Sequence, residues 1–281
     1  MKSAERIVAA NGVNLCAQTF GDRADPAILL IHGATASMHA WDEELCERLS
    51  AGRFVVRYDH RDTGRSVSYP PGAPGYSMRD LVADAMGVLD ALGVERAHLV
   101  GCSMGGGIAL RAALDQGDRV TSLTLVATSP GGADLPPMSP EFLAYTQGAQ
   151  QPDWSDRAAV VEHVLGLLRV FAGGSKHFDE AVMRELVGLD VDRTRNVASS
   201  QINHFVMEVG EPIRHQLAEI DVPTLVVHGA HDPVFPLGHA RALAKEIRGA
   251  RLLVLEDAGH LLPRAAFDLV VPAILQHTAN R

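Results

Sequence analysis

Short apolar runs alternate with segments of helical periodicity through most of the chain. The apolar runs are continuous, as in strands covered on both faces, and comprise Ala27–His32, Phe54–Asp59, Ala97–Gly101, Ser122–Ala127, Thr224–His228 and Leu252–Glu256. Apolar residues recur at helical spacing in Trp41–Leu49, Met78–Leu92, Gly105–Asp115, Leu237–Ile247 and a final segment from about Pro263. This alternation predicts an α/β fold with a mostly parallel central sheet flanked by helices on both sides.

Two further strands are expected at the amino end. Arg6–Ala10 and Val13–Phe20 flank the dipeptide Asn11-Gly12. Because Asn-Gly favours the type I′ turn, these segments are predicted to form a β-hairpin ahead of the parallel strands.

The middle of the chain breaks the alternation. It opens with the Pro/Gly-rich stretch Ser129–Pro137 and contains no convincing strand. Helices are expected near Pro140–Gly148, Ser155–Phe171, Asp179–Val191 and Arg193–Val209. We therefore expect a helical cap over residues 130–219, inserted in a core formed by residues 1–129 and 220–281.

Composition narrows the range of partners. The 281 residues carry 34 acidic and 25 basic side chains, a net charge of −9, which disfavours binding to a nucleic-acid backbone. No apolar run is long enough for a membrane span, and the first residues lack the apolar core of a signal peptide. Three widely spaced cysteines form neither a disulfide framework nor a zinc pattern. A cytoplasmic protein without membrane or nucleic-acid partners is expected.

The most informative segment is Gly101-Cys102-Ser103-Met104-Gly105. It lies between a predicted strand and a predicted helix, the context in which a G-x-S-x-G sequence forms a nucleophile elbow. A serine on so sharp a turn has a strained backbone, and a Cβ at a flanking position would clash. Ser103 is therefore the predicted nucleophile.

Polar residues also follow other strands, where ligands of open α/β sheets bind. Asp232 comes just after one strand and His260 after the last, giving the order Ser103, Asp232, His260. A serine hydroxyl needs a base, His260, and a buried carboxylate, Asp232, to orient the imidazole. A lone Asp after a strand more often caps a turn, and Asp257 is a rival acid that lies only three residues before His260.

The oxyanion of such a reaction needs preorganised donors. The peptide N–H groups of Met104 and Ala34 are the predicted pair, and His32 and Gly33 either brace their loop or contact the substrate. Trp154 and His204 in the cap are candidates for substrate binding, although residues of this kind at helical spacing more often pack in a core.

A further loop, Tyr58–Ser66, is expected to be structural, with Arg61 or Arg65 as an alternative substrate contact. Gly105–Gly107 lacks the signature of a phosphate-binding loop, and no His, Asp or Glu cluster has metal-ligand spacing. No metal and no cofactor are expected.

These residues resemble the α/β-hydrolase superfamily. The likeness rests on His32-Gly33, Asp59–Ser66, the elbow, Gly229–Asp232 and Asp257–His260. The version Arg61-Asp62-Thr63-Gly64-Arg65-Ser66 is similar to the aclacinomycin methylesterase-like carboxylesterases, whereas many relatives have glycine in place of Asp62. Enzymes of that kind cleave a methyl ester from an anthracycline polyketide, and the resemblance implies a capped carboxylesterase.

The expected function is cofactor-independent hydrolysis of a small-molecule carboxylic ester through an acyl-enzyme. A C–C bond hydrolase, a lactonase or a perhydrolase would use the same site. A ligand receptor that retains the fold without catalysis is the alternative from another class. The sequence predicts no oligomeric state.

Overall fold

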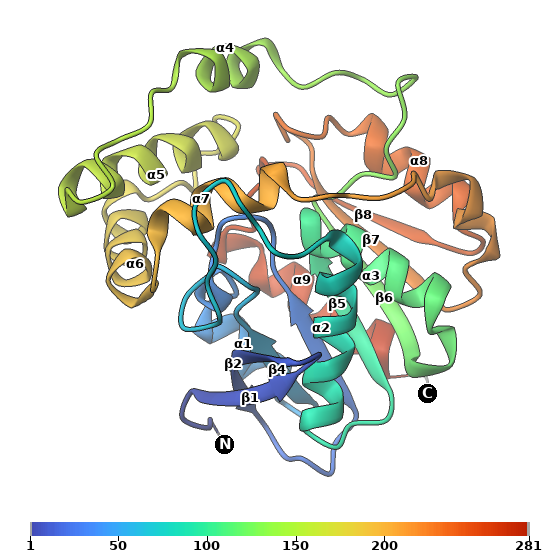
Figure 1. Cartoon of the computed structure of the whole chain (residues 1–281). Helices are drawn as coiled ribbons and strands as arrows, with labels where there is room; N and C mark the ends of the chain where they lie inside the picture. The colour runs from blue at the N-terminus through green and yellow to red at the C-terminus, as the bar shows by residue number, and fades with distance from the viewer. Residues whose placement is uncertain (1, 280–281) are drawn as a thin grey trace.

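A central eight-stranded β-sheet organises the computed structural model, which describes residues 2–279 (Figure 1). The strands are β1 (Arg6–Ala10), β2 (Val13–Phe20), β3 (Ala27–Ile31), β4 (Phe54–Tyr58), β5 (Ala97–Cys102), β6 (Val120–Val126), β7 (Thr224–Gly229) and β8 (Arg251–Leu255). Their order across the sheet is β1-β2-β4-β3-β5-β6-β7-β8. β1, β2 and β4 pair antiparallel and all other neighbours pair parallel, which confirms the predicted sheet.

The predicted hairpin is also confirmed. Asn11 and Gly12 have φ angles of 47° and 74°, as both central residues of a type I′ turn require. The turn joins β1 to β2 at one edge of the sheet.

Helices cover both faces of the sheet. One apolar cluster joins α2 (Met78–Ala91), α3 (Met104–Asp115) and α8 (Gly238–Glu246) to Leu29 and Ile31 of β3. A second cluster, on the opposite face, joins α1 (Glu43–Leu49) and α9 (Phe267–Thr278) to Ile28 and Leu30. Successive residues of β3 thus alternate between two buried cores, which explains why its sequence is apolar throughout.

Some helices begin later than the apolar periodicity predicts, because a capping residue or a 3₁₀ turn stands at their start. The helix predicted over Trp41–Leu49 begins at Glu43, because the Asp42 carboxylate accepts a hydrogen bond from the N–H of Glu44 (2.8 Å). The short 3₁₀ helix η1 (Met38–Ala40) precedes it. Likewise, the last predicted helix starts with the 3₁₀ turn η4 (Arg264–Ala266) before α9.

Four helices fill the segment between β6 and β7, as expected. They are α4 (Pro140–Gly148), α5 (Arg157–Phe171), α6 (Glu180–Arg193) and α7 (Val197–Val206). Figure 1 shows them together at one end of the sheet. α7 contacts the segments after β3 and β4, so this is the end at which the parallel strands finish. The domain limits at residues 130 and 219 stay predictions.

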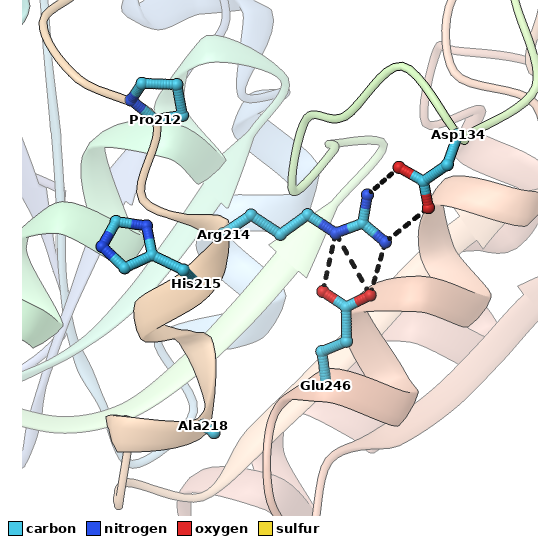
Figure 2. Close-up of a pocket in the computed structure, with 6 residues that line it drawn as sticks. All are labelled: Asp134, Pro212, Arg214, His215, Ala218 and Glu246. Atoms are coloured by element: carbon cyan, nitrogen blue, oxygen red, sulfur yellow. Dashed lines mark hydrogen bonds and ion pairs between the residues drawn. The ribbon is translucent and has the colours of Figure 1, made fainter.

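One arginine links the chain that enters this helical segment, the chain that leaves it, and helix α8 of the core. Arg214, in η3 (Arg214–Glu219), contacts Asp134 in the segment after β6 and Glu246 at the end of α8 (Figure 2). The Arg214–Glu246 contact is 2.6 Å. Because two carboxylates face one guanidinium, the adjoining surface cavity of about 640 Å³ offers no uncompensated positive charge. Within residues 2–279 no helix is long and apolar enough to cross a membrane.

Candidate active site

Ser103 lies at the sharp turn between β5 and α3. Its φ and ψ are 53° and −119°, a combination that non-glycine residues rarely adopt. The Ser103 N–H donates to Val126 O (3.0 Å) and its carbonyl accepts from Thr128 Oγ1 (2.8 Å), so the neighbouring strand holds the turn. A Cβ at Gly101 would lie 2.3 Å from a backbone oxygen, and one at Gly105 2.2 Å. The predicted clash of a Cβ at either glycine is therefore confirmed.

Three of the predicted residues meet at the ends of β5, β7 and β8. His260 Nε2 lies 3.1 Å from Ser103 Oγ, and His260 Nδ1 lies 2.8 Å from Asp232 Oδ2. Asp232 and His260 are both buried, whereas Ser103 retains access to solvent. An alcohol in contact with an imidazole that a buried carboxylate orients can transfer its proton to the ring.

The surroundings of Asp232 favour its ionised form. Burial alone would raise its pKa, but His260 and the N–H of Phe235 together lower it. The other carboxylate oxygen accepts from the N–H groups of Val234 (2.8 Å) and Phe235 (2.9 Å). His228 donates from Nε2 to Phe235 O (2.7 Å) and lies 3.4 Å from Asp232 Oδ2, so it fixes the same turn. Nothing in the sequence pattern singled out His228 for this position.

The oxyanion hole formed by the peptide N–H groups of Ala34 and Met104 stays a prediction. Within residues 2–279, neither the N–H of Ala34 nor that of Met104 donates a hydrogen bond. Gly33 brings the Ala34 segment against the elbow, since a Cβ on Gly33 would lie 3.1 Å from Ser103 Cβ. The next residue, Thr35, has a φ of 70°.

His204 holds this loop from α7. The N–H of Thr35 donates to His204 Nδ1 (3.1 Å), and His204 Nε2 contacts Arg61 O at 3.0 Å. A nitrogen that accepts carries no proton, so the ring is neutral and donates from Nε2. Burial lowers the pKa of His204 to about 4. Both nitrogens are occupied by backbone, and the geometry gives His204 a positioning role.

His32 lies behind the same loop. Its Nδ1 donates to Gly33 O (2.7 Å), and its ring packs against His60 with 4.2 Å between centroids. Burial lowers the pKa of His32 to about 3. With 1% of its surface exposed, His32 braces the loop rather than facing a ligand. Substrate contact by Gly33 or by Trp154, whose half-buried ring packs against His163, stays a prediction.

The rival and alternative residues lie elsewhere. Asp257 is exposed and pairs with Lys176 at 2.9 Å. Arg61 is buried and pairs with Asp84 through two contacts of 2.7 Å, so the structural interpretation of its loop is confirmed. Arg65 pairs with Glu5 at 3.1 Å.

Two aromatic rings cover His260, and the sequence pattern does not indicate either of them. The rings of Phe171 and Phe235 lie 4.9 Å and 5.6 Å from the imidazole, centroid to centroid. The His260 N–H also donates to Phe171 O at the end of α5 (2.7 Å). A contact between residues almost ninety positions apart leaves no periodic signal, so only the fold reveals it.

Comparisons with known proteins agree with this geometry. The chain is 34% identical to rhodomycin D methylesterase DauP of Streptomyces sp. (strain C5) and 33% identical to rhodomycin D methylesterase DnrP of Streptomyces peucetius, each over 97% of both chains. It superposes on the enol-lactonase of Burkholderia xenovorans LB400 with a TM-score of 0.76 at 25% identity, covering 98% of this chain and 100% of that one. Residues 26–263 match the model of the α/β hydrolase fold, and the chain belongs to that family.

Proposed function

We propose that this protein is a carboxylesterase with Ser103 as nucleophile, His260 as general base and acid, and Asp232 as the residue that orients His260. The observation that carries the proposal is the continuous chain of contacts from Asp232 Oδ2 through His260 to Ser103 Oγ, at 2.8 and 3.1 Å. The unengaged N–H groups of Ala34 and Met104 support their assignment as the oxyanion hole.

The reaction has two halves. Ser103 Oγ attacks the ester carbonyl carbon while His260 Nε2 takes the hydroxyl proton, and the negative oxygen binds the two N–H groups. The ester C–O bond then breaks, His260 returns the proton to the departing alkoxide, and an alcohol leaves. Water, deprotonated by His260, attacks the acyl-enzyme, and the acid departs as Ser103 regains its proton. Asp232 stabilises the imidazolium in both halves.

The substrate we propose is the methyl ester of a large aromatic acid of the polyketide type. Two relatives that match nearly the whole chain are methylesterases of rhodomycin D. Phe171 and Phe235 beside His260 supply the apolar surface that an aromatic acyl group needs. Helices α4–α7 would act as a cap over this site. We place the protein in a reducing cytoplasm, where its three cysteines would remain thiols.

The test measures methanol and acid release from a polycyclic aromatic methyl ester. We expect turnover by the wild type and a loss of about a millionfold in kcat for Ser103→Ala. Ser155→Ala, which changes an exposed serine ahead of α5, is the matched control and should retain full activity. Asp232→Asn should lower kcat about 10⁴-fold, because the imidazole loses its orienting carboxylate.

Product analysis separates the reactions that share this site. A lactonase would open a ring without releasing an alcohol, a C–C hydrolase would release two carbon fragments, and a perhydrolase would consume peroxide. Ligand binding without any product would favour a receptor. Equal methanol release by the wild type and Ser103→Ala would overturn the proposed mechanism.

A further inference from the structure

A second polar cavity lies at the opposite end of the sheet from Ser103. It has a volume of about 320 Å³ and is formed at the starts of β5, β6, β7 and β8 and at the end of α9. His98 lines it from β5, the strand that ends in the elbow. The five residues from His98 to Ser103 correspond to about 16 Å of strand, so this cavity is separate from the candidate active site.

The floor of this cavity is buried yet polar. His98, Ser122, Thr224 and His277 line it, and each has at most 9% of its surface exposed. Polar side chains at the start of a sheet buried on both faces cost free energy unless they are hydrogen-bonded. The proposed esterase reaction uses none of them.

His98 has a ring nitrogen left over. Its Nδ1 is 2.8 Å from Ser122 Oγ, but within residues 2–279 its Nε2 has no hydrogen-bond partner. When Ser122 donates to Nδ1, the neutral ring carries its proton on Nε2 and offers a donor to the cavity. A side chain that is 97% buried thus has one ring nitrogen without a protein partner, in a residue that lines a cavity.

One arginine lines the same cavity, and two others lie near its His98. Arg251 lines it and lies 3.5 Å from His277 Nδ1. Arg53 and Arg96 lie close enough to His98 to lower the pKa of its imidazole, after the larger effect of burial. Within residues 2–279 none of these three arginines is paired with a carboxylate, whereas Arg214 beside the larger cavity faces two. On a protein of net charge −9, this is a local concentration of uncompensated cations.

We propose that this cavity, which we call the basal cavity, binds a small oxyanion, either a phosphate group or a carboxylate. His98 Nε2 donates to the anion from the buried floor and Arg251 contributes charge and hydrogen bonds from the rim. The hydroxyl group of Thr121 and the amide of Gln276 supply further donors among the lining residues, whereas the Ser122 hydroxyl proton is used by His98 Nδ1. The volume suits a molecule at the small end of the usual ligand range.

Titration calorimetry with inorganic phosphate, at constant ionic strength and neutral pH, tests the proposal on the full chain. We expect saturable binding with a Kd of about 1 mM or below. Arg251→Gln should weaken binding at least tenfold, because it removes the rim cation. The matched control is Arg248→Gln, an exposed arginine outside the cavity that pairs with Asp221, and it should bind like the wild type.

His98 gives a second readout that does not depend on a buried substitution. With ¹⁵N-labelled histidine, phosphate should shift the Nε2 resonance of His98 in the wild type, and Arg251→Gln should need at least tenfold more phosphate for the same shift. The same titrations are carried out with sulfate and with acetate. A preference for phosphate and sulfate assigns a phosphorylated or sulfated ligand, and a preference for acetate assigns a carboxylate.

Three results would overturn the site. They are no saturation at about 20 mM phosphate, full binding by Arg251→Gln, and an equal loss in Arg251→Gln and Arg248→Gln, which would indicate unspecific charge attraction. Ser103→Ala should bind phosphate normally. Failure of the esterase proposal and failure of the basal cavity are therefore distinguishable.

Discussion

Asn203 Nδ2 donates to Asp62 Oδ2 at 2.8 Å and thereby joins α7 to the loop after β4. Asp62 has a φ of 68°, a conformation that glycine adopts freely, so a carboxylate here occupies a strained backbone position. The same carboxylate also accepts from the N–H of Tyr69 (2.6 Å) and from Tyr76 Oη (2.7 Å). An aspartate rather than a glycine is useful at position 62 because its carboxylate anchors α7 through Asn203.

Replacing this carboxylate should loosen α7. Asp62→Asn tolerates the positive φ, but its amide offers donors where Tyr76 and Asn203 also donate. We expect the free energy of unfolding to fall by about 2–3 kcal/mol, measured by urea denaturation. Asp118→Asn, at an exposed aspartate, is the control and should stay within about 0.5 kcal/mol of the wild type. Equal stability of Asp62→Asn and the control would contradict this role.

Features that depend on residues close together in the sequence could be predicted, and features that depend on distant residues could not. Strands such as β3 and the elbow around Ser103 depend on local patterns, and both are where the sequence indicates. The start of α7 depends on Asn196, whose side chain caps the helix, so α7 begins at Val197 and not at the predicted Arg193. Capping competes with periodicity, and periodicity alone does not locate it.

Contacts between distant segments were beyond sequence reasoning. Arg193 at the end of α6 pairs with Asp59 at 2.7 Å and with Glu5 at 3.0 Å, and all three side chains are largely buried. None of these charges stands out among the exposed charges of the chain. Only the fold brings them together, and the same holds for Asn203, His228 and Phe171.

Gly33 should be sensitive to a single methyl group. In Gly33→Ala the new Cβ would lie 3.1 Å from Ser103 Cβ, which forces the Ala34 segment and the elbow apart. Because the Ala34 N–H is the proposed oxyanion donor, kcat for ester hydrolysis should fall about a hundredfold, with KM nearly unchanged.

Gly107→Ala is the matched control for Gly33→Ala. Gly107 lies in α3, and a Cβ there meets nothing within 4 Å. The variant should keep full activity and gain about 0.5–1 kcal/mol in the free energy of unfolding, since alanine favours a helix. Normal kcat in Gly33→Ala would exclude tight packing between the two segments as a requirement for catalysis.

Buried histidines should make the protein sensitive to mild acid. Burial lowers the pKa of His32 to about 3 and those of His98 and His204 to about 4, so all three are neutral in the folded protein at pH 5. In the unfolded chain they are protonated below about pH 6.5. Their stabilising effect is complete above that pH and is lost as the pH falls toward 4. Burial raises the pKa of Asp190 to about 6, so at pH 5 the folded protein holds one proton on Asp190 that the unfolded chain does not. This proton offsets one of the three that the histidines bind in the unfolded chain.

Near pH 5 these four groups alone make the unfolded state bind about two more protons than the folded state, and His60, whose pKa burial also lowers, adds to the difference. The free energy of unfolding should fall by at least roughly 3 kcal/mol per pH unit there. Urea denaturation between pH 7 and pH 4.5, in buffers without phosphate, measures this slope. His204→Gln should reduce this slope by the contribution of about one proton. His215→Gln, at an exposed histidine, should leave the slope unchanged. A free energy of unfolding that does not change over this pH range would show that these imidazoles titrate normally.

Phe171 should determine selectivity for aromatic esters without entering the chemistry. Its ring packs against His260 and is stacked on Phe142, with 5.7 Å between the two phenylalanine centroids. In Phe171→Ala the backbone carbonyl still accepts the His260 N–H, so the imidazole keeps its position. KM for a polycyclic aromatic methyl ester should rise about tenfold, as expected from the loss of one aromatic contact. The kcat for a small aliphatic ester should change less than twofold, a ratio within about 0.4 kcal/mol.

The control for this prediction is Phe205→Ala, which removes another aromatic ring of the helical segment. Phe205 is 68% exposed on α7, so its loss should leave both substrates unaffected. Steady-state kinetics of the two variants on both esters separate two interpretations. A KM effect confined to Phe171→Ala and to the aromatic ester assigns Phe171 to the acyl-binding surface. An equal fall in kcat for both esters would instead mean that the ring holds His260 in place, and Phe171 would then be a positioning residue.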